Sequence, residues 1–322
     1  MRPSPSLVLA LATGACVSAT DPDTAVTLGD EAELDSSDAD EDTVTGDDAP
    51  VLDQGADPSP ALRCEKVDLL FVIDDSHSMA SEQGNLIASF PEFFANIQAT
   101  LDTVDSVQVG VVATDAYAFN AEACRSLGAL VTQTGGAGSS NAVCGPFSGA
   151  SGTFMTEADA LDAFSCAGQL GIDGSIDERP MEAMLTALDS SLSEAGGCNE
   201  GFSRKDALLV VVVITDEEDD HQEISGQLHG SPGEPEDWFA ALAAHKGVES
   251  NVAVLSIIGG LPDNECGEPV GVGAEPSPRL QAFTQMFSHG FLGDICAWSY
   301  GPFFSEAIEV VESACADFEA VP

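Results

Sequence analysis

The residues best suited to chemistry in this chain lie in one short run, Asp74-Asp75-Ser76-His77-Ser78. The run follows directly on an apolar stretch that is typical of a strand buried on both faces. It brings the carboxylate of Asp74 and the hydroxyls of Ser76 and Ser78 close together in sequence. Magnesium and calcium prefer oxygen ligands. The run therefore predicts one half of a binding site for a divalent cation.

Further acids follow two other apolar stretches of the same kind. Asp115 comes after the second stretch, and Asp216 and Glu217 come after the third. Because the carboxyl ends of parallel strands meet at one edge of a sheet, we expect these acids to lie close to Asp74. Carboxylates at one edge repel one another unless a cation lies between them. We predict Asp216 as a ligand and Asp115 and Glu217 as neighbours of ligands, with an ordinary turn role left open for Asp115.

Short apolar stretches rich in β-branched residues alternate with helical patterns along the chain. The stretches have the length and hydrophobicity of strands in a parallel sheet, and they comprise residues 67–73, 107–113, 208–214 and 252–258. The helical patterns repeat apolar residues three and four positions apart, and they comprise residues 82–101, 181–192, 238–244 and 304–311. This alternation predicts an α/β fold with a doubly wound, mostly parallel sheet flanked by helices.

Two stretches interrupt the alternation, residues 116–152 and 259–278, and we interpret them as loop insertions that need cross-links. The chain has nine cysteines. Setting Cys16 aside leaves an even set for disulfides, namely Cys64, Cys124, Cys144, Cys166, Cys198, Cys266, Cys296 and Cys315. Among the many possible pairings we expect local ones, such as Cys124 with Cys144 and Cys266 with Cys296. No C-x-x-C spacing indicates zinc.

The N-terminal residues 1–16 have the charged start, short apolar centre and small-residue end of a secretory signal. Their last four residues, Thr-Gly-Ala-Cys, resemble the bacterial lipobox, which implies a lipid on Cys16 and a place at the outer membrane or cell surface. A periplasmic or secreted protein is the alternative. Residues 17–62 are rich in acids, lack lysine, arginine and aromatic residues, and predict a disordered tether. One domain is expected at residues 63–322.

The charge of the chain restricts its partners. The formal net charge is -46, and the chain has only three lysines, Lys66, Lys205 and Lys246. No basic stripe is available to neutralise phosphates, so nucleic acid is excluded as a partner. An acidic surface suits cations and basic partners, and it also keeps an exposed protein soluble. We expect contact with the membrane only through the N-terminal lipid, and the sequence leaves the oligomeric state open.

The motifs at the strand ends resemble those of one known family. Residues 71–79, Phe-Val-Ile-Asp-Asp-Ser-His-Ser-Met, and residues 213–216, Val-Ile-Thr-Asp, resemble the von Willebrand factor type A (VWA) domain. The metal-ion-dependent adhesion site (MIDAS) of that family joins D-x-S-x-S, a later threonine and the aspartate of a T-D-G turn. The resemblance implies a VWA fold, with metal ligands at positions 74, 76, 78 and 216.

This chain departs from the family pattern at several positions. Asp75 and His77 replace glycines of the first motif, and Glu217 replaces the glycine of the last. The middle motif, normally G-x-T-x-x-x-A-L, corresponds to residues 174–184, where Glu178 stands in place of the threonine. This pattern resembles a branch of bacterial surface lipoproteins and implies Glu178 as a fifth ligand. Glu178 offers an internal ligand for the position that adhesive members leave open to a partner, and the choice between Mg²⁺ and Ca²⁺ stays open.

Several readings of these residues remain. Ser76 or Ser78 at a helix N-terminus is also a common cap, although capping does not account for the acids after the other strands. Asp219 and Asp220 are interpreted as a solvated, acid-rich helix start. Asp74-Asp75-Ser76 does not match the D-x-D loop of the aspartyl phosphatases, and no G-x-S-x-G elbow or P-loop is present.

We predict a binding or adhesion module, without enzymatic activity, for a protein or glycan at the cell surface. One alternative is a metal-dependent hydrolase with Glu178 or Glu217 as its base. The other is a structural domain whose metal site is filled internally.

Overall fold

The structure is a computed structural model that describes residues 64–100, 104–159, 161–220, 222–224, 227–260 and 274–320. The expected signal at residues 1–16, the lipidation site Cys16, the expected tether at residues 17–62 and Cys266 lie outside the described residues. These assignments stay predictions.

The centre of the fold is a six-stranded sheet with the order β3-β2-β1-β4-β7-β8. Its parallel strands are β1 (Lys66–Ile73), β2 (Ser106–Ala113), β4 (Leu208–Ile214), β7 (Val252–Ile258) and β8 (Gly290–Asp294). The short β3 (Met155–Thr156) pairs antiparallel with β2, and β5 (Gln222–Ile224) forms a separate two-stranded sheet with β6 (Gln227–His229). All four predicted strands are confirmed, and the predicted α/β class with a mostly parallel sheet is correct.

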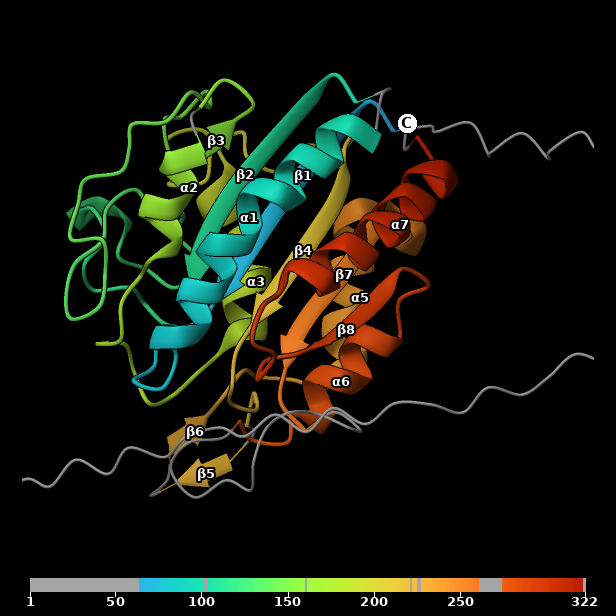
Figure 1. Ribbon diagram of the computed structural model, residues 1–322. Helices are drawn as coiled ribbons and strands as arrows, with labels where there is room; N and C mark the ends of the chain where they lie inside the picture. The colour runs from blue at the N-terminus through green and yellow to red at the C-terminus, as the bar shows by residue number, and fades with distance from the viewer. Residues whose placement is uncertain are drawn as a thin grey trace, which may run out of the picture. The chain divides into compact units, whose positions relative to one another are not determined.

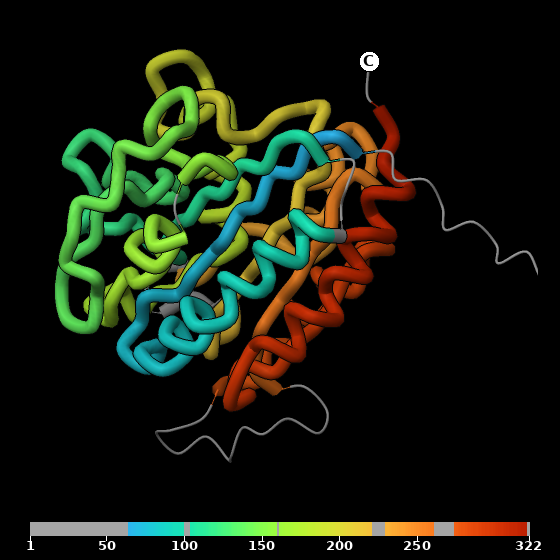
Figure 2. The backbone as a smooth tube through the Cα atoms, turned by 45° about the horizontal axis from the view of Figure 1, so that its top comes forward, coloured from blue at the N-terminus to red at the C-terminus, as the bar shows by residue number. Residues whose placement is uncertain are grey.

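Helices cover both faces of the sheet (Figure 1). One face carries α1 (Ala80–Thr100), α2 (Leu161–Gly168) and α7 (Gly301–Asp317). The other carries α3 (Pro180–Leu188), α5 (Pro235–Lys246) and α6 (Pro278–Gln285). The short elements are α4 (Ser190–Ser193), η1 (Glu122–Cys124) and η2 (Glu249–Asn251). Figure 2 shows α1 and α7 side by side across the same face.

Side-chain alternation along β1 explains the two layers. Leu69 and Phe71 belong to the hydrophobic cluster under α1, α2 and α7, whereas Leu70 and Val72 belong to the cluster under α3, α5 and α6. All four side chains are fully buried. Burial of each stabilises the fold by roughly 2 kcal/mol relative to exposure. A strand apolar on both faces therefore has to lie inside a sheet covered on both sides.

The predicted helices are confirmed with shifted ends. The pattern at residues 181–192 breaks after Leu188, because Asp189 leaves the helical conformation and its side chain accepts a hydrogen bond from Ser191 N, capping α4. The insertion at residues 116–152 is confirmed as a long connection whose regular structure is the one turn of η1 and an isolated bridge between Gln133 and Val143.

The strand order creates a switch point beside β1. The chain places β2 on one side of β1 and β4 on the other, so the connections diverge there. Ile73, the last residue of β1, pairs with Ala113 of β2 and Ile214 of β4. The residues that follow these three strands therefore meet at one edge, and ligands bind at such places in open α/β sheets.

Three disulfides join described cysteines, Cys64 with Cys315, Cys124 with Cys198 and Cys144 with Cys166. The expected pairing of Cys124 with Cys144 is wrong. Each of these two residues ties the 116–152 insertion to a different neighbouring segment, rather than closing the insertion on itself. Cys296 is also disulfide-bonded, and its pairing with Cys266 stays a prediction.

The disulfides are typical of a protein in an oxidising compartment outside the cytoplasm. Across the described residues, no helix is both long enough and apolar enough to cross a membrane.

Removing the Cys64–Cys315 bond should lower the stability of the domain strongly. The bond joins residues 251 positions apart, and the longest closed loops restrict the unfolded chain most. We expect the Cys64→Ala/Cys315→Ala variant to lose about 2–5 kcal/mol of unfolding free energy, with a melting temperature lower by roughly 10 °C in calorimetry. The Cys144→Ala/Cys166→Ala variant opens a loop of only 22 residues and should lose less. Equal losses in both variants would contradict this expectation.

Candidate functional site

The carboxylate of Asp74 is fully buried at the end of β1 and is fixed from two sides. Its Oδ1 accepts a hydrogen bond from Ser76 N at 2.7 Å, and its Oδ2 accepts one from Thr215 Oγ1 at 2.7 Å. Its own backbone N donates to Ile214 O at 3.0 Å. Burial raises the pKa of Asp74 to about 6, and the charge of Asp216 adds to the rise.

A chain of polar contacts leads from the first loop to the end of β4. Ser76 Oγ and Ser78 Oγ lie 3.2 Å apart, and Ser78 Oγ donates to Asp216 Oδ1 at 3.1 Å. Asp216 is 9% exposed. Four of the five predicted ligands, Asp74, Ser76, Ser78 and Asp216, are therefore brought together at one edge of the sheet. Thr215, which was predicted only as part of the motif, connects the end of β4 to Asp74 through its hydroxyl.

Glu178 lies on the other side of Asp74, just ahead of α3. Its Oε2 accepts a hydrogen bond from the Thr114 hydroxyl at the end of β2, whereas its buried Oε1 has no hydrogen-bond partner. Burial and then the charge of Asp74 raise the pKa of Glu178 to about 11. No hydrogen bond joins it to the serines or to Asp216 in the described part of the chain. Glu178, the fifth predicted ligand, is thus close enough to interact with Asp74 electrostatically. Its hydrogen bond, however, is to Thr114, the residue after β2.

Asp75 is a buried acid that sequence reasoning treated only as a replaced glycine. The residue is 2% exposed and its Oδ1 has no hydrogen-bond partner. Burial, Asp115 and Asp74 together raise the pKa of Asp75 to about 8. A second acid directly after a strand buried on both faces was the available signal, because successive side chains point to opposite faces and both faces of such a sheet are covered.

Asp115 does more than form a turn. Its Oδ2 accepts a hydrogen bond from Ser175 N at 2.9 Å and so holds the segment before α3, whereas its Oδ1 is buried without a partner. Burial raises the pKa of this carboxyl as well. Asp115 therefore lies beside Asp75 and Glu178, as expected of a neighbour of the ligands.

Gln83 connects the first loop to the segment before α3, and sequence reasoning missed it. Its Nε2 donates to Asp74 O at 2.9 Å and to Gly171 O at 2.8 Å, and its Oε1 accepts from Gly171 N at 3.0 Å. Gly174 packs so closely that a Cβ there would lie 2.5 Å from Asp75 Cγ. One buried glutamine and one glycine thus keep the two acidic loops in contact.

Replacing Gln83 with methionine should destabilise the site while keeping the side chain's size. The change leaves backbone groups of Asp74 and Gly171 buried without partners, which costs about 2–4 kcal/mol of unfolding free energy. Chemical denaturation measures this loss. Gln98→Met, at an exposed position of the same helix, is the matched control and should change stability by less than about 0.5 kcal/mol. Similar losses in both variants would show that the Gln83 contacts contribute little.

The acids after Asp216 have separate roles. Burial, then Asp74 and Asp216, raise the pKa of the half-buried Glu217 to about 7, and its backbone N donates to Thr215 Oγ1 at 3.0 Å. Glu218 Oε2 accepts from Arg279 N at 2.8 Å at the start of α6. Asp219 Oδ2 accepts from Met181 N at 3.0 Å at the start of α3.

The expectation that Asp219 is solvated is wrong. Asp219 is fully buried, because its carboxylate satisfies the N-terminal backbone of a helix from another part of the chain.

The donor atoms of the site fit a hard cation in type. Across the described residues, no group of three or more Asp, Glu, His or Cys side chains is arranged so that it could hold a metal ion. The three acids of the predicted set, Asp74, Glu178 and Asp216, are therefore not gathered around one point where they could share an ion. All its donors are oxygens, and three buried carboxylate oxygens, of Asp75, Asp115 and Glu178, have no hydrogen-bond partner. Binding by the predicted set would require Glu178 to move toward Asp74 and Asp216.

Comparisons with known proteins give distant likenesses. No protein-family model matches the chain, and no curated protein matches it. Proximal thread matrix protein 1 from the mussel byssus is 13% identical to this chain, with a TM-score of 0.40. The match covers 78% of this chain and 49% of the mussel protein's chain. The pilus adhesin SpaC from Lactobacillus rhamnosus GG is 14% identical, with a TM-score of 0.37, over 80% of this chain and 30% of its own. This chain thus spans about half or less of either protein, and the likenesses are too weak to assign a family or a function.

Proposed function

We propose that residues 63–322 form a VWA-like domain that binds one divalent cation at the carboxyl edge of its sheet. Asp74, Ser76, Ser78 and Asp216 are the ligands from β1 and β4, and Glu178 is the ligand from the segment before α3. The support is the D-x-S-x-S and Thr-Asp sequence pattern, together with the contacts that join four of these side chains.

The observation that carries the proposal is the excess of buried carboxylate oxygens. Asp74, Asp75 and Glu178 are each at most 4% exposed, and oxygens of Asp75 and Glu178 have no partner. Burying an ionised carboxylate without compensation costs several kcal/mol. A divalent cation supplies the missing positive charge, and its ligands would stay ionised at neutral pH. The all-oxygen donor set suits both Ca²⁺ and Mg²⁺.

With the cation bound, we propose that the domain acts as a binding module rather than an enzyme. The cation would polarise an oxygen of a protein or glycan partner, or fix the loops that contact it. Glu178 would limit how far a partner's carboxylate can reach the metal, because it offers an internal carboxylate for the position that a partner would otherwise fill. The module would act outside the cytoplasm, as its disulfides suggest, and we propose a lipid anchor at Cys16 on the outer membrane or cell surface.

Calorimetric titration of the purified chain with Ca²⁺ and with Mg²⁺ tests the cation site. We expect saturable binding of at least one cation, weakened about tenfold or more by Glu178→Gln. Glu182→Gln is the matched control, because Glu182 lies one turn further along and pairs with Arg179 rather than with the site. The absence of binding by either cation would overturn the proposal, and equal effects of the two variants would remove Glu178 from the ligand set.

A further inference from the structure

Strand β8 ends the sheet, and among the described residues no strand pairs with its outer side. Val254 N donates to His289 O at 3.0 Å, and Ile295 N donates to Ile258 O at 3.1 Å, so alternate residues of the β8 stretch serve the ladder to β7. The N–H and C=O of Leu292 then point away from β7. The described residues offer no hydrogen-bond partner to these two groups. An exposed edge of this kind is a template for a further strand.

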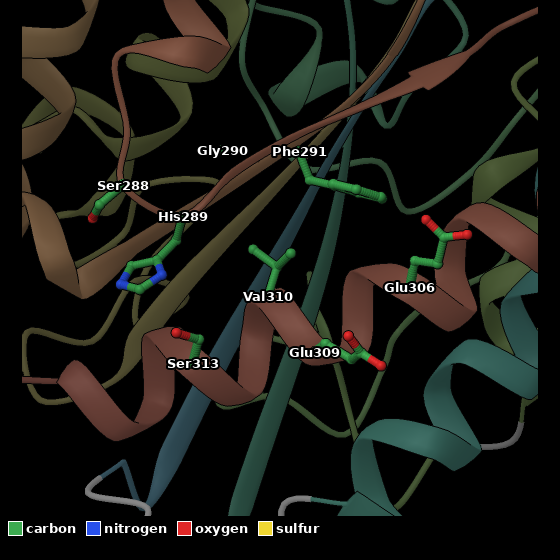
Figure 3. Close-up of a pocket in the computed structure, with 8 residues that line it drawn as sticks. All are labelled: Ser288, His289, Gly290, Phe291, Glu306, Glu309, Val310 and Ser313. Carbon is green, nitrogen blue, oxygen red and sulfur yellow. The ribbon is translucent and has the colours of Figure 1, made fainter. Parts of the chain in front are cut away.

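A groove of about 410 Å³ lies between β8 and α7 (Figure 3). Phe291 and Val310 contribute apolar surface, whereas Glu306 and Glu309 lie on α7 with their carboxylates exposed. His289 also lines the groove, is 5% exposed, and has its Nε2 at 3.5 Å from Asp317 Oδ2. The groove therefore combines an apolar floor and two acids beside a strand edge that no described strand pairs with.

Charge selects the kind of occupant. The two glutamates lie in a chain whose formal net charge is -46, so a second copy of the chain would bring strong repulsion to this edge. A segment carrying lysine or arginine would instead be attracted to Glu306 and Glu309. An extended segment matches the outward N–H and C=O of Leu292, and every second side chain of it would point toward the α7 face, where Phe291, Val310 and the two glutamates all lie.

We propose that the outer edge of β8 and the groove beside it bind an extended, basic segment of a partner protein, added to the sheet as a strand. Main-chain hydrogen bonds to Leu292 supply part of the affinity, and Glu306 and Glu309 select basic side chains. This surface is separate from the candidate cation site, since it belongs to β8 and α7 rather than to the ends of β1 and β4. Binding therefore does not depend on a divalent cation.

A short peptide with lysine and valine in turn at every second position and serine between them is the probe, since both kinds of side chain then point to one face, and the same peptide with alternate backbone nitrogens methylated is its control. Methylation keeps the charge but removes the donors that a strand needs. We expect saturable binding of the unmodified peptide to the full chain in the presence of chelator, about tenfold weaker binding of the methylated peptide, and slower hydrogen exchange at the Leu292 amide. Equal binding of the two peptides would overturn the proposal.

Variants of the protein separate the groove from general attraction by charge. Glu306→Gln/Glu309→Gln should weaken peptide binding several-fold, whereas Glu92→Gln/Glu236→Gln, which removes the same charge from exposed positions of α1 and α5, should leave it nearly unchanged. Leu292→Pro removes the edge N–H and should weaken binding about tenfold. If this variant fails to fold, the comparison of the two peptides and the two glutamine variants still test whether the segment binds at β8 as a strand. Equal losses in the two glutamine variants would assign the binding to net charge and refute the site.

Discussion

Replacing Asp74 with asparagine should lower the affinity for divalent cations by on the order of 100-fold. Asp74 is fixed by residues that follow both β1 and β4, through Ser76 N and Thr215 Oγ1. Asparagine keeps the shape and one carbonyl oxygen but removes the charge that a hard cation requires. Titration calorimetry with Ca²⁺ and Mg²⁺ measures the effect. Asp162→Asn, an exposed acid on α2, is the control and should bind as the natural chain does.

The same variant also separates loss of a ligand from loss of the fold. In the absence of a cation, Asp74 is a buried acid whose pKa is raised to about 6, so its ionisation at pH 7 opposes folding. We expect Asp74→Asn in chelator to be at least as stable as the natural chain, because asparagine buries no charge. A variant less stable by more than about 2 kcal/mol would instead make Asp74 a structural residue, because its hydrogen bonds would then outweigh its charge.

Without a cation, the protein should become less stable as the pH rises from 5 to 8. The pKa of Asp74 is raised from 3.8 to about 6 and that of Asp75 to about 8, while burial raises the pKa of Glu217 from 4.5 to about 7. Between the unfolded and folded pKa values the folded chain holds more protons than the unfolded chain, so the free energy of unfolding falls with rising pH. Asp74 alone accounts for about 1.4 kcal/mol across this range, because the rest of its contribution is lost below pH 5. Glu178 continues the same trend above pH 8.

Melting temperatures in chelator and in saturating cation, measured at several pH values, check this dependence. A bound cation replaces the protons, so we expect the downward slope to vanish or to reverse in calcium or magnesium, whichever the chain binds. Asp75→Asn in chelator should flatten the slope, whereas Asp162→Asn should not. A flat profile in chelator would show that the buried acids are compensated within the protein, and identical slopes with and without cation would argue against a metal at this edge.

The strands were predictable because their hydrophobicity is nearly continuous. Residues 208–214 are fully buried throughout, so the pattern of a two-sided buried strand contains the whole signal. The β8 sequence, Gly-Phe-Leu-Gly-Asp, has two glycines in five residues, and β3 has only two residues, so neither provides enough pattern to distinguish a strand from a loop. Their place in the sheet depends on neighbouring strands.

The candidate site was predictable where residues adjoin strand ends, as Asp74 and Asp216 do. Gln83 was not, because a glutamine in an amphipathic helix is ordinarily exposed, and its burial depends on the segment that contains Gly171. The pairing of Cys124 with Cys198 was hidden for the same reason. Sequence distance does not reveal which segments the fold brings together.

The bond between Cys64 and Cys315 also bears on how the domain carries load. It links the chain just ahead of β1, at the middle of the sheet, to the last turns of α7. Tension applied to the chain ahead of Cys64 reaches the strand and the helix together, so β1 cannot be drawn out of the sheet without also displacing α7. Oxidised protein should therefore resist pulling from that end for longer than reduced protein, since forced unfolding is governed by the rate of the first rupture.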